Sequence, residues 1–217
     1  MKSSKILASL LVLFTFAACQ TTQPKKLPPE TPNPGEKQLW GSESPRPAWT
    51  VGEEVSIKGE VVTIVAMSDK FATEKYARED AEQSARKHAI QRFSTEVKSK
   101  IQNVVNMVGV STDINNPARV QQEFEGQLSK GRISQMQNKL WYLEKWQDPS
   151  GAVYWKAFLL SEIPKSILDQ ALAETMRTEN AKLQGQKSNA TSDDKKASID
   201  SMMKAFEEIE KNGFTLE

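Results

Sequence analysis

The side chains with the greatest capacity for chemistry are scarce in this sequence, which contains one cysteine, Cys19, and one histidine, His88. A single cysteine excludes an intrachain disulfide and any metal site built from several cysteines. One histidine likewise excludes a metal centre built from several histidines. His88 lies beside Ala85 and Ala89 in an alanine-rich stretch, which is typical of a polar residue at the edge of a core. We therefore predict no catalytic residue, no metal ligand and no cofactor at these positions.

A serine three residues before a lysine is the one spacing that matches an envelope enzyme, because penicillin-binding enzymes use it. It occurs at Ser84–Lys87, Ser192–Lys195 and Ser201–Lys204. The Ser-Asp-Asn and Lys-Thr-Gly motifs that complete such a site do not occur. A phosphate-binding loop, a dinucleotide-binding glycine pattern and a His-Glu-x-x-His motif are also missing. The sequence therefore predicts a protein that is not an enzyme.

The residues before Cys19 give this cysteine a different role. Two lysines are followed by an apolar run, Ile6 to Phe16, and then by two alanines. This order predicts a secretory signal peptide at residues 1–18, cleaved between Ala18 and Cys19. The stretch Phe16-Ala17-Ala18-Cys19 also resembles the lipobox of bacterial lipoproteins, which implies that Cys19 is the acylated first residue of the mature chain. An ordinary signal peptide with an incidental cysteine is the alternative.

Acylation of Cys19 would anchor the chain in a lipid bilayer. Several acyl chains on one residue give durable attachment, because each buried methylene contributes about 0.8 kcal/mol. By analogy with lipoprotein sorting, Gln20 implies the outer membrane of a two-membrane bacterium, with the folded domain facing the periplasm. The expected partners are the bilayer, through Cys19, and either an envelope protein or further copies of this chain.

Residues 19–46 are predicted to form a lipidated, proline-rich tether. Five prolines occur between Gln20 and Gly35 with almost no apolar residue among them, so the segment cannot bury enough surface to fold. Extended at about 3.1 Å per residue, the tether would reach roughly 80 Å. Trp40 lies in this tether without an obvious core, and Trp49 stands where order should begin. Both tryptophans are therefore candidates for contacts with the domain, another copy or a partner.

Residues 47–183 are predicted to form an α+β domain. β-branched residues favour strand structure after residue 55, and two aromatic strands flank Asp148-Pro149-Ser150-Gly151, which suits a hairpin turn. Apolar residues spaced by three and four predict helices. We expect a small antiparallel sheet packed against one long and one or two shorter helices. The predicted strands span residues 55–69, 140–147 and 152–160, and the predicted helices span residues 73–108, 117–137 and 164–183.

The two aromatic strands place apolar side chains on both faces of the predicted sheet, because successive strand residues point to opposite faces. One face should pack on the helices, and the other should be partly covered or exposed to a partner. The first face holds Trp141, Leu143, Trp155, Ala157 and Leu159, and the second holds Tyr142, Trp146, Tyr154 and Phe158.

The C-terminal region is predicted to consist of a polar linker, residues 184–197, and an amphipathic end helix, residues 198–217. A helix of this length does not fold alone, so its apolar face must bind its own domain, another copy or a partner. The apolar face holds Ile199, Met202, Met203, Phe206 and Ile209. Met202, Met203 and Phe206 are therefore candidate partner-contact residues.

The charge of the chain limits its partners. Lysine and arginine number 29, against 28 aspartates and glutamates. A nucleic-acid binder needs a clustered basic surface that neutralises phosphates. The near-neutral balance therefore argues against a nucleic-acid partner.

Several of these features together resemble the LPP-twenty family of bacterial lipoproteins. The resemblance covers residues 47 to about 172 and rests on the lipobox cysteine, on Pro47-Ala48-Trp49, on the helix "YAREDAEQSARKHAIQRF" and on the strands "LWYLEKW" and "AVYWKAFLLSEIP". It implies no catalytic residues. It implies assembly through protein–protein contacts, because better-understood members look like flagellar outer-membrane components whose copies form rings or disks.

We therefore expect an outer-membrane lipoprotein that acts as a structural or assembly component, with the flagellar base as one location. A tethered periplasmic regulator of a peptidoglycan synthase is the first alternative, because a long tether suits that role equally well. An envelope hydrolase is the alternative from a different functional class.

Overall fold

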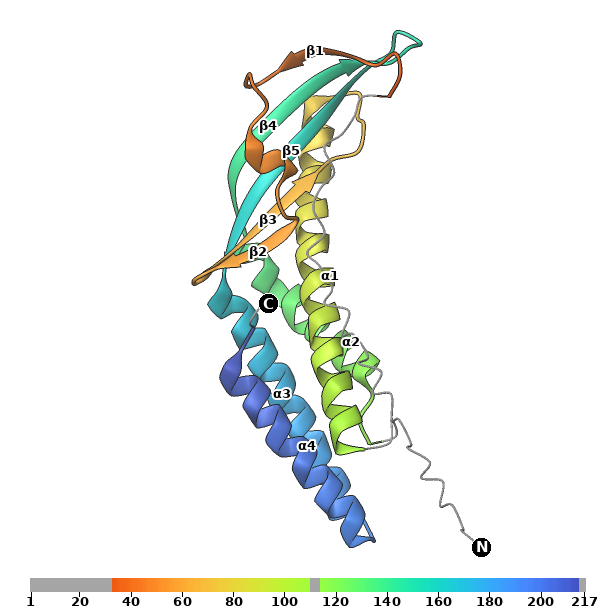
Figure 1. Cartoon of the computed structure of the whole chain (residues 1–217), viewed down its shortest axis with the longest axis vertical. Coiled ribbons are helices and arrows are strands. Elements are labelled where there is room, and N and C mark those ends of the chain that lie inside the picture. Colours follow the sequence, from red (N-terminus) through yellow and green to blue (C-terminus); the bar gives the residue numbers. More distant parts are fainter. Residues whose placement is uncertain (1–32, 110–113, 215–217) are drawn as a thin grey trace, which may run out of the picture.

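The computed structural model describes residues 33–109 and 114–214. The signal peptide, Cys19 and the first part of the predicted tether lie outside the described residues. The predicted α+β class is confirmed, because the described chain combines one antiparallel sheet with α-helices (Figure 1). The strands are β1 (Lys37–Gly41), β2 (Val55–Lys58), β3 (Val61–Met67), β4 (Gln137–Gln147) and β5 (Val153–Pro164). The helices are α1 (Glu74–Val108), α2 (Pro117–Gln127), α3 (Lys165–Ser188) and α4 (Asp193–Asn212).

The sheet has the strand order β1-β4-β5-β3-β2, and each neighbouring pair is antiparallel. The predicted hairpin turn joins β4 to β5, where the Asp148 carboxylate accepts hydrogen bonds from the backbone N–H groups of Ser150 and Ala152. Gly151 has φ 90°, a conformation that a residue without a Cβ adopts without strain. The local sequence thus fixes the register of the two longest strands.

A row of buried residues on α1 holds this helix against the sheet and against the other helices. Four alanines in its first half let α1 approach β3 and β5 closely, because a methyl side chain adds little thickness. Larger residues continue the row in the second half, where α1 packs on α2 and α4 (Figure 1). The row consists of Ala77, Ala81, Ala85, Ala89, Phe93, Val97 and Ile101.

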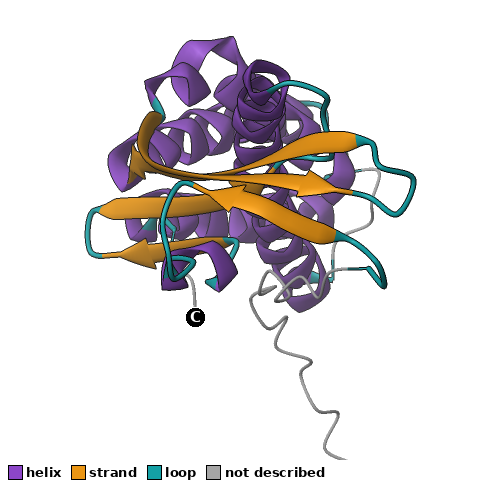
Figure 2. Cartoon of the chain, turned by 90° about the horizontal axis from the view of Figure 1, so that it is seen from above, coloured by secondary structure: helices purple, strands orange, loops and turns teal. Residues whose placement is uncertain are grey.

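The two predicted faces of the aromatic strands are confirmed. Leu143, Ala157 and Leu159 belong to the core beneath the helices, with Trp141 and Trp155 packed against it. The opposite face, which we call the outer face, holds Tyr142, Trp146, Tyr154 and Phe158, and all four are buried. Residues 42–52, which we call the strap, include the short helix η1 (Ala48–Val51) and pack across this outer face. Figure 2 shows the strands as one layer, with the helices behind them and along one side.

The prediction that residues 37–41 belong to a free tether is wrong. These residues form β1 and pair with β4, with Lys37 opposite Gln147 and Gly41 opposite Glu144. Lys70 also forms an ion pair with Glu36, and its hydrogen bond lowers the pKa of Glu36 to about 2. The folded domain therefore begins well before residue 47. The composition of residues 19–46 concealed β1, because its pairing partner lies about a hundred residues away in the chain.

Two further boundaries differ from the prediction. The predicted linker, residues 184–197, is mostly helical, because α3 continues to Ser188 and α4 begins at Asp193, where the Ser192 hydroxyl caps the first turn. The predicted helix at residues 117–137 ends early: Gly131 has φ 97°, and β4 begins at Gln137. The linker was predicted from its polar composition and the helix from its apolar spacing, whereas capping and backbone conformation decide both boundaries.

Candidate functional site

A pocket of about 390 Å³ lies on the outer face of the sheet, where β1 and the strap meet β4. It is lined by side chains of several chemical types, among them Gln38, Arg46, Tyr142, Glu144 and Trp146. Residues of β1 and the strap are about a hundred positions away from those of β4 in the sequence. The antiparallel pairing of β1 with β4 is what brings them together.

Glu144 is a buried charged residue in the lining of this pocket. Its side chain is 1% exposed, and its Oε2 accepts a hydrogen bond of 2.8 Å from the Trp146 indole. The Arg46 guanidinium lies 3.7 Å from Oε1 and 4.2 Å from the centre of the Phe158 ring. Arg46 Nε also donates to the Thr50 hydroxyl at 2.9 Å, which fixes the side chain against the strap. A buried carboxylate needs such partners, because burial without them is costly.

Tyr142 stands beside Glu144 and Gln38. Burial first, and the Glu144 carboxylate second, raise the pKa of the Tyr142 phenol above its ordinary value. The phenol therefore stays protonated at neutral pH and can donate or accept a hydrogen bond, but it does not act as a base. Gly41 lets β1 approach this ring, since a Cβ at Gly41 would lie 2.9 Å from the Tyr142 hydroxyl oxygen. The pocket thus offers fixed hydrogen-bonding groups beside aromatic rings, which are the features of a binding site.

His88 lies elsewhere, where α1 passes the segment before β2. Its Nδ1 is 2.7 Å from Glu54 Oε1, and both side chains are partly exposed. The contact joins α1 to the residue directly before β2. Within residues 33–109 and 114–214, no group of three or more histidines, cysteines, aspartates or glutamates is placed to hold a metal ion.

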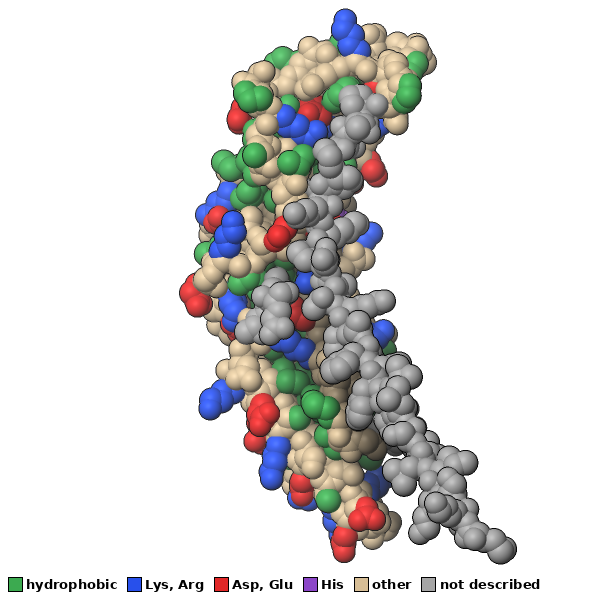
Figure 3. Space-filling model, viewed as in Figure 1, with side chains coloured by type: hydrophobic (Ala, Val, Ile, Leu, Met, Phe, Trp, Pro, Cys, Tyr) green, Lys and Arg blue, Asp and Glu red, His purple; other side chains and the backbone are tan. Residues whose placement is uncertain are grey.

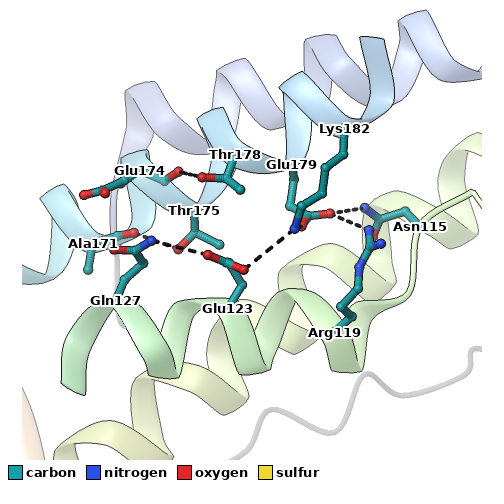
Figure 4. A network of polar contacts seen from close by, with 10 residues as sticks. All are labelled: Asn115, Arg119, Glu123, Gln127, Ala171, Glu174, Thr175, Thr178, Glu179 and Lys182. Atoms are coloured by element: carbon teal, nitrogen blue, oxygen red, sulfur yellow. Dashed lines mark hydrogen bonds and ion pairs between the residues drawn. The ribbon is translucent and has the colours of Figure 1, made fainter. Parts of the chain in front are cut away.

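A second polar cluster lies between α2 and α3 (Figure 4). Glu179 is fully buried, and its carboxylate accepts hydrogen bonds from Arg119 at 2.8 Å, Lys182 at 2.7 Å and Asn115 at 3.2 Å. Lys182 also lies 3.7 Å from a carboxylate oxygen of Glu123. These groups neutralise one another, so the cluster joins the two helices.

Glu96 occupies a third charged position, on α1 near the carboxyl end of α4. Lys100 Nζ lies 3.3 Å from its carboxylate but also donates to the Gly213 carbonyl. Neither oxygen of Glu96 accepts a hydrogen bond of good geometry from the described residues. Burial, the largest influence, therefore outweighs the attraction of Lys100 and raises the pKa of Glu96 above its ordinary value of 4.5.

Replacing Glu96 with glutamine is expected to stabilise the protein at neutral pH. A carboxyl whose pKa is raised by folding keeps its proton longer in the folded state, so wild-type stability falls as the pH rises from 4.5 through the folded pKa. Glutamine cannot ionise and avoids this loss. Urea midpoints should be equal for the two proteins at pH 4 and higher for the variant at pH 7. A variant that is less stable at pH 7 would show that the ion pair with Lys100 dominates.

The structure separates the predicted contact residues into two groups. Trp40 is 47% exposed, on β1, and Trp49 is partly buried in η1. Met202 and Phe206 are fully buried, and Met203 packs against the same core. Of the possibilities left open for the end helix, its own domain is the one observed, because α4 packs its apolar face onto α3 and α1. Cys19 and Ala18 lie outside the described residues.

Sequence reasoning missed the pocket and Phe214. Phe214 is fully buried, with ring centres 5.2 Å from Phe93 and 5.5 Å from Phe124. An apolar residue directly after a glycine that ends a helix is a known contact position, so Gly213 followed by Phe214 was a usable signal. No comparable signal existed for the pocket.

The chain matches no protein-family model, and no curated protein or solved structure is significantly similar to it. In the part of the chain that the structure describes, no helix is both long and apolar enough to cross a membrane. Lysine and arginine side chains alternate with aspartate and glutamate over the face seen in Figure 3, in agreement with the near-neutral composition.

Proposed function

We propose that this protein is a lipid-anchored component of the outer membrane whose periplasmic domain works by binding another envelope protein or further copies of itself. The anchor is supported by the lipobox-like stretch Phe16-Ala17-Ala18-Cys19. The binding role is supported above all by the pocket between β1, the strap and β4.

The composition of the pocket favours a macromolecular partner. Its size is within the range of ligand sites, but it opens beside an edge strand that carries the exposed residues Leu39 and Trp40. Edge strands and exposed aromatic residues are common at protein interfaces. A partner side chain could enter the pocket and bind Arg46, Glu144 and Gln38 while its backbone crosses β1.

The position of β1 also favours a partner near the membrane. Because β1 belongs to the domain, residues 20–36 are the longest segment that can serve as a tether. At about 3.1 Å per residue this segment reaches roughly 50 Å. An assembly component beside the outer membrane therefore suits the chain better than a regulator that reaches across the periplasm to a peptidoglycan synthase.

Photo-crosslinking in living cells tests both parts of this proposal. A photoreactive residue in place of Glu43, which lines the pocket, is expected to give one discrete crosslinked product in the membrane fraction. Mass spectrometry of the product distinguishes a second copy from a different envelope protein. The same residue in place of Lys98, exposed on α1, is the matched control and should give no such product.

The Cys19→Ala variant completes the experiment. Without an acylated cysteine, the chain should move from the membrane to the soluble fraction, and the product at Glu43 should decrease with it. A Cys19→Ala chain that stays in the membrane would contradict the anchor. A pocket position that crosslinks no more than Lys98 would contradict the binding role.

A further inference from the structure

A patch of aromatic and basic residues lies at the β1 end of the sheet, on the face that the helices cover elsewhere. Strand registers place its residues in two rows across three strands. One row consists of Trp40, Lys145 and Trp155, and the other of Lys37, Gln147 and Val153. We call these six residues the end patch.

The end patch is open because α1 does not extend over it. α1 packs chiefly on β3 and β5, whereas β1 and the adjoining part of β4 lie beyond its edge. As a result Trp40 is 47% exposed and Val153 is 40% exposed. Leu39, at the β1 bulge beside Trp40, is 43% exposed. Trp40 meets Trp155 edge to face with ring centres 5.8 Å apart, so the aromatic surface is held in place.

The charge of the end patch is positive. Lys145 Nζ lies 5.5 Å from the centre of the Trp155 ring, and Lys37 stands on the exposed edge strand. Neither lysine forms an ion pair with the described residues. Of the two carboxylates that adjoin the end patch in sequence, Glu36 forms an ion pair with Lys70, and Asp148 accepts hydrogen bonds from Ser150 and Ala152 in the hairpin turn.

We propose that the end patch binds the surface of an anionic phospholipid bilayer. Tryptophan is enriched at membrane–water interfaces, where its ring is apolar and its N–H remains hydrated. Lysine ammonium groups next to such rings attract lipid phosphates. Trp40 and Leu39 enter the headgroup region, and Lys37 and Lys145 bind phosphates.

The course of the chain places this surface near a bilayer. Residues 20–36 join Cys19 to β1, so β1 is the part of the folded domain nearest to Cys19 along the chain. This step rests on the proposed lipid anchor. A short tether raises the effective concentration of a second contact to about the millimolar range, so a weak affinity of the end patch is sufficient to orient the domain.

Vesicle co-sedimentation of the chain from residue 19 to 217 with Cys19→Ser tests the lipid contact by itself. This protein keeps every described residue but carries neither the apolar run 6–16 nor an acyl chain. We expect it to bind vesicles that contain phosphatidylglycerol and to bind purely zwitterionic vesicles more weakly. Lys37→Glu and Lys145→Glu should each weaken vesicle binding about fivefold or more. Trp40→Ala should weaken vesicle binding several-fold. For the protein with the unaltered patch, 0.5 M salt should reduce binding.

Lys98→Glu and Met107→Ala are the matched controls, because both residues are exposed on α1 far along the chain from the patch. Circular dichroism establishes that each variant is folded. Because Lys37 is exposed on the edge strand, Lys37→Glu disturbs no buried contact. Failure to bind anionic vesicles, or equal losses in patch and control variants, overturns the proposal. Patch variants could instead bind vesicles normally but lose the crosslinked product at Glu43. That result would overturn the lipid proposal and show that the patch binds a protein partner. The Cys19→Ala fractionation tests the anchor independently of all these outcomes.

Discussion

Replacing Phe214 with alanine is expected to lower the free energy of unfolding by about 3–5 kcal/mol, the usual range for a buried phenylalanine. The Phe214 ring is fully buried and contacts Phe93 on α1 and Phe124 on α2, with ring centres 5.2 and 5.5 Å away. Its backbone N–H donates to Asp169 on α3 at 2.9 Å. One residue therefore closes the space between three helices, and alanine would leave a cavity there.

Tyr76→Ala provides the control for this change. Tyr76 also loses an aromatic ring, but it is 56% exposed on the first turn of α1, so its loss should change stability by no more than about 0.5 kcal/mol. Urea unfolding followed by circular dichroism gives both values, and an unchanged m-value shows that only the midpoint has moved. A loss below about 1 kcal/mol for Phe214→Ala would contradict the packing of the C-terminal segment between the helices.

Regular periodicity made much of this fold predictable. The alanines of α1 recur at the spacing of a helix face, and all four alanines at positions 77, 81, 85 and 89 are buried as expected. The aromatic strands were equally predictable, because alternation assigns Leu143 and Tyr142 to opposite faces. Both signals are local, in that neighbouring residues carry all the information that is needed.

Features that depend on distant parts of the chain were not predictable. β1 has little apolar character, and only its pairing with β4 makes it a strand. The same pairing builds the pocket, since Gln38 meets Tyr142 across the sheet. Polar composition also misplaced the linker, because the polar residues after Leu183 lie on the solvent side of a helix whose other side is buried.

The buried cluster around Glu179 should respond very differently to the loss of its cations and to the loss of its carboxylate. Arg119→Met with Lys182→Met leaves a fully buried carboxylate without a counter-charge, which is expected to cost about 3 kcal/mol or more. Glu179→Met removes the buried charge instead. The two cations keep contact with water, since the Arg119 and Lys182 side chains are 45% and 37% exposed.

The Glu179→Met variant should therefore lose about 1 kcal/mol, mainly because the buried Asn115 amide loses its acceptor. The triple variant, with methionine at positions 119, 179 and 182, should be more stable than the Arg119→Met, Lys182→Met double variant, although it carries one more substitution. Urea midpoints at pH 7 measure all three. Equal losses for the single and double variants would show that water reaches Glu179 and that the cluster does not depend on paired charges. The predicted order of stabilities follows from desolvation. The Glu179 carboxylate, buried between α2 and α3, depends on its cationic partners, whereas the surface cations do not depend on Glu179.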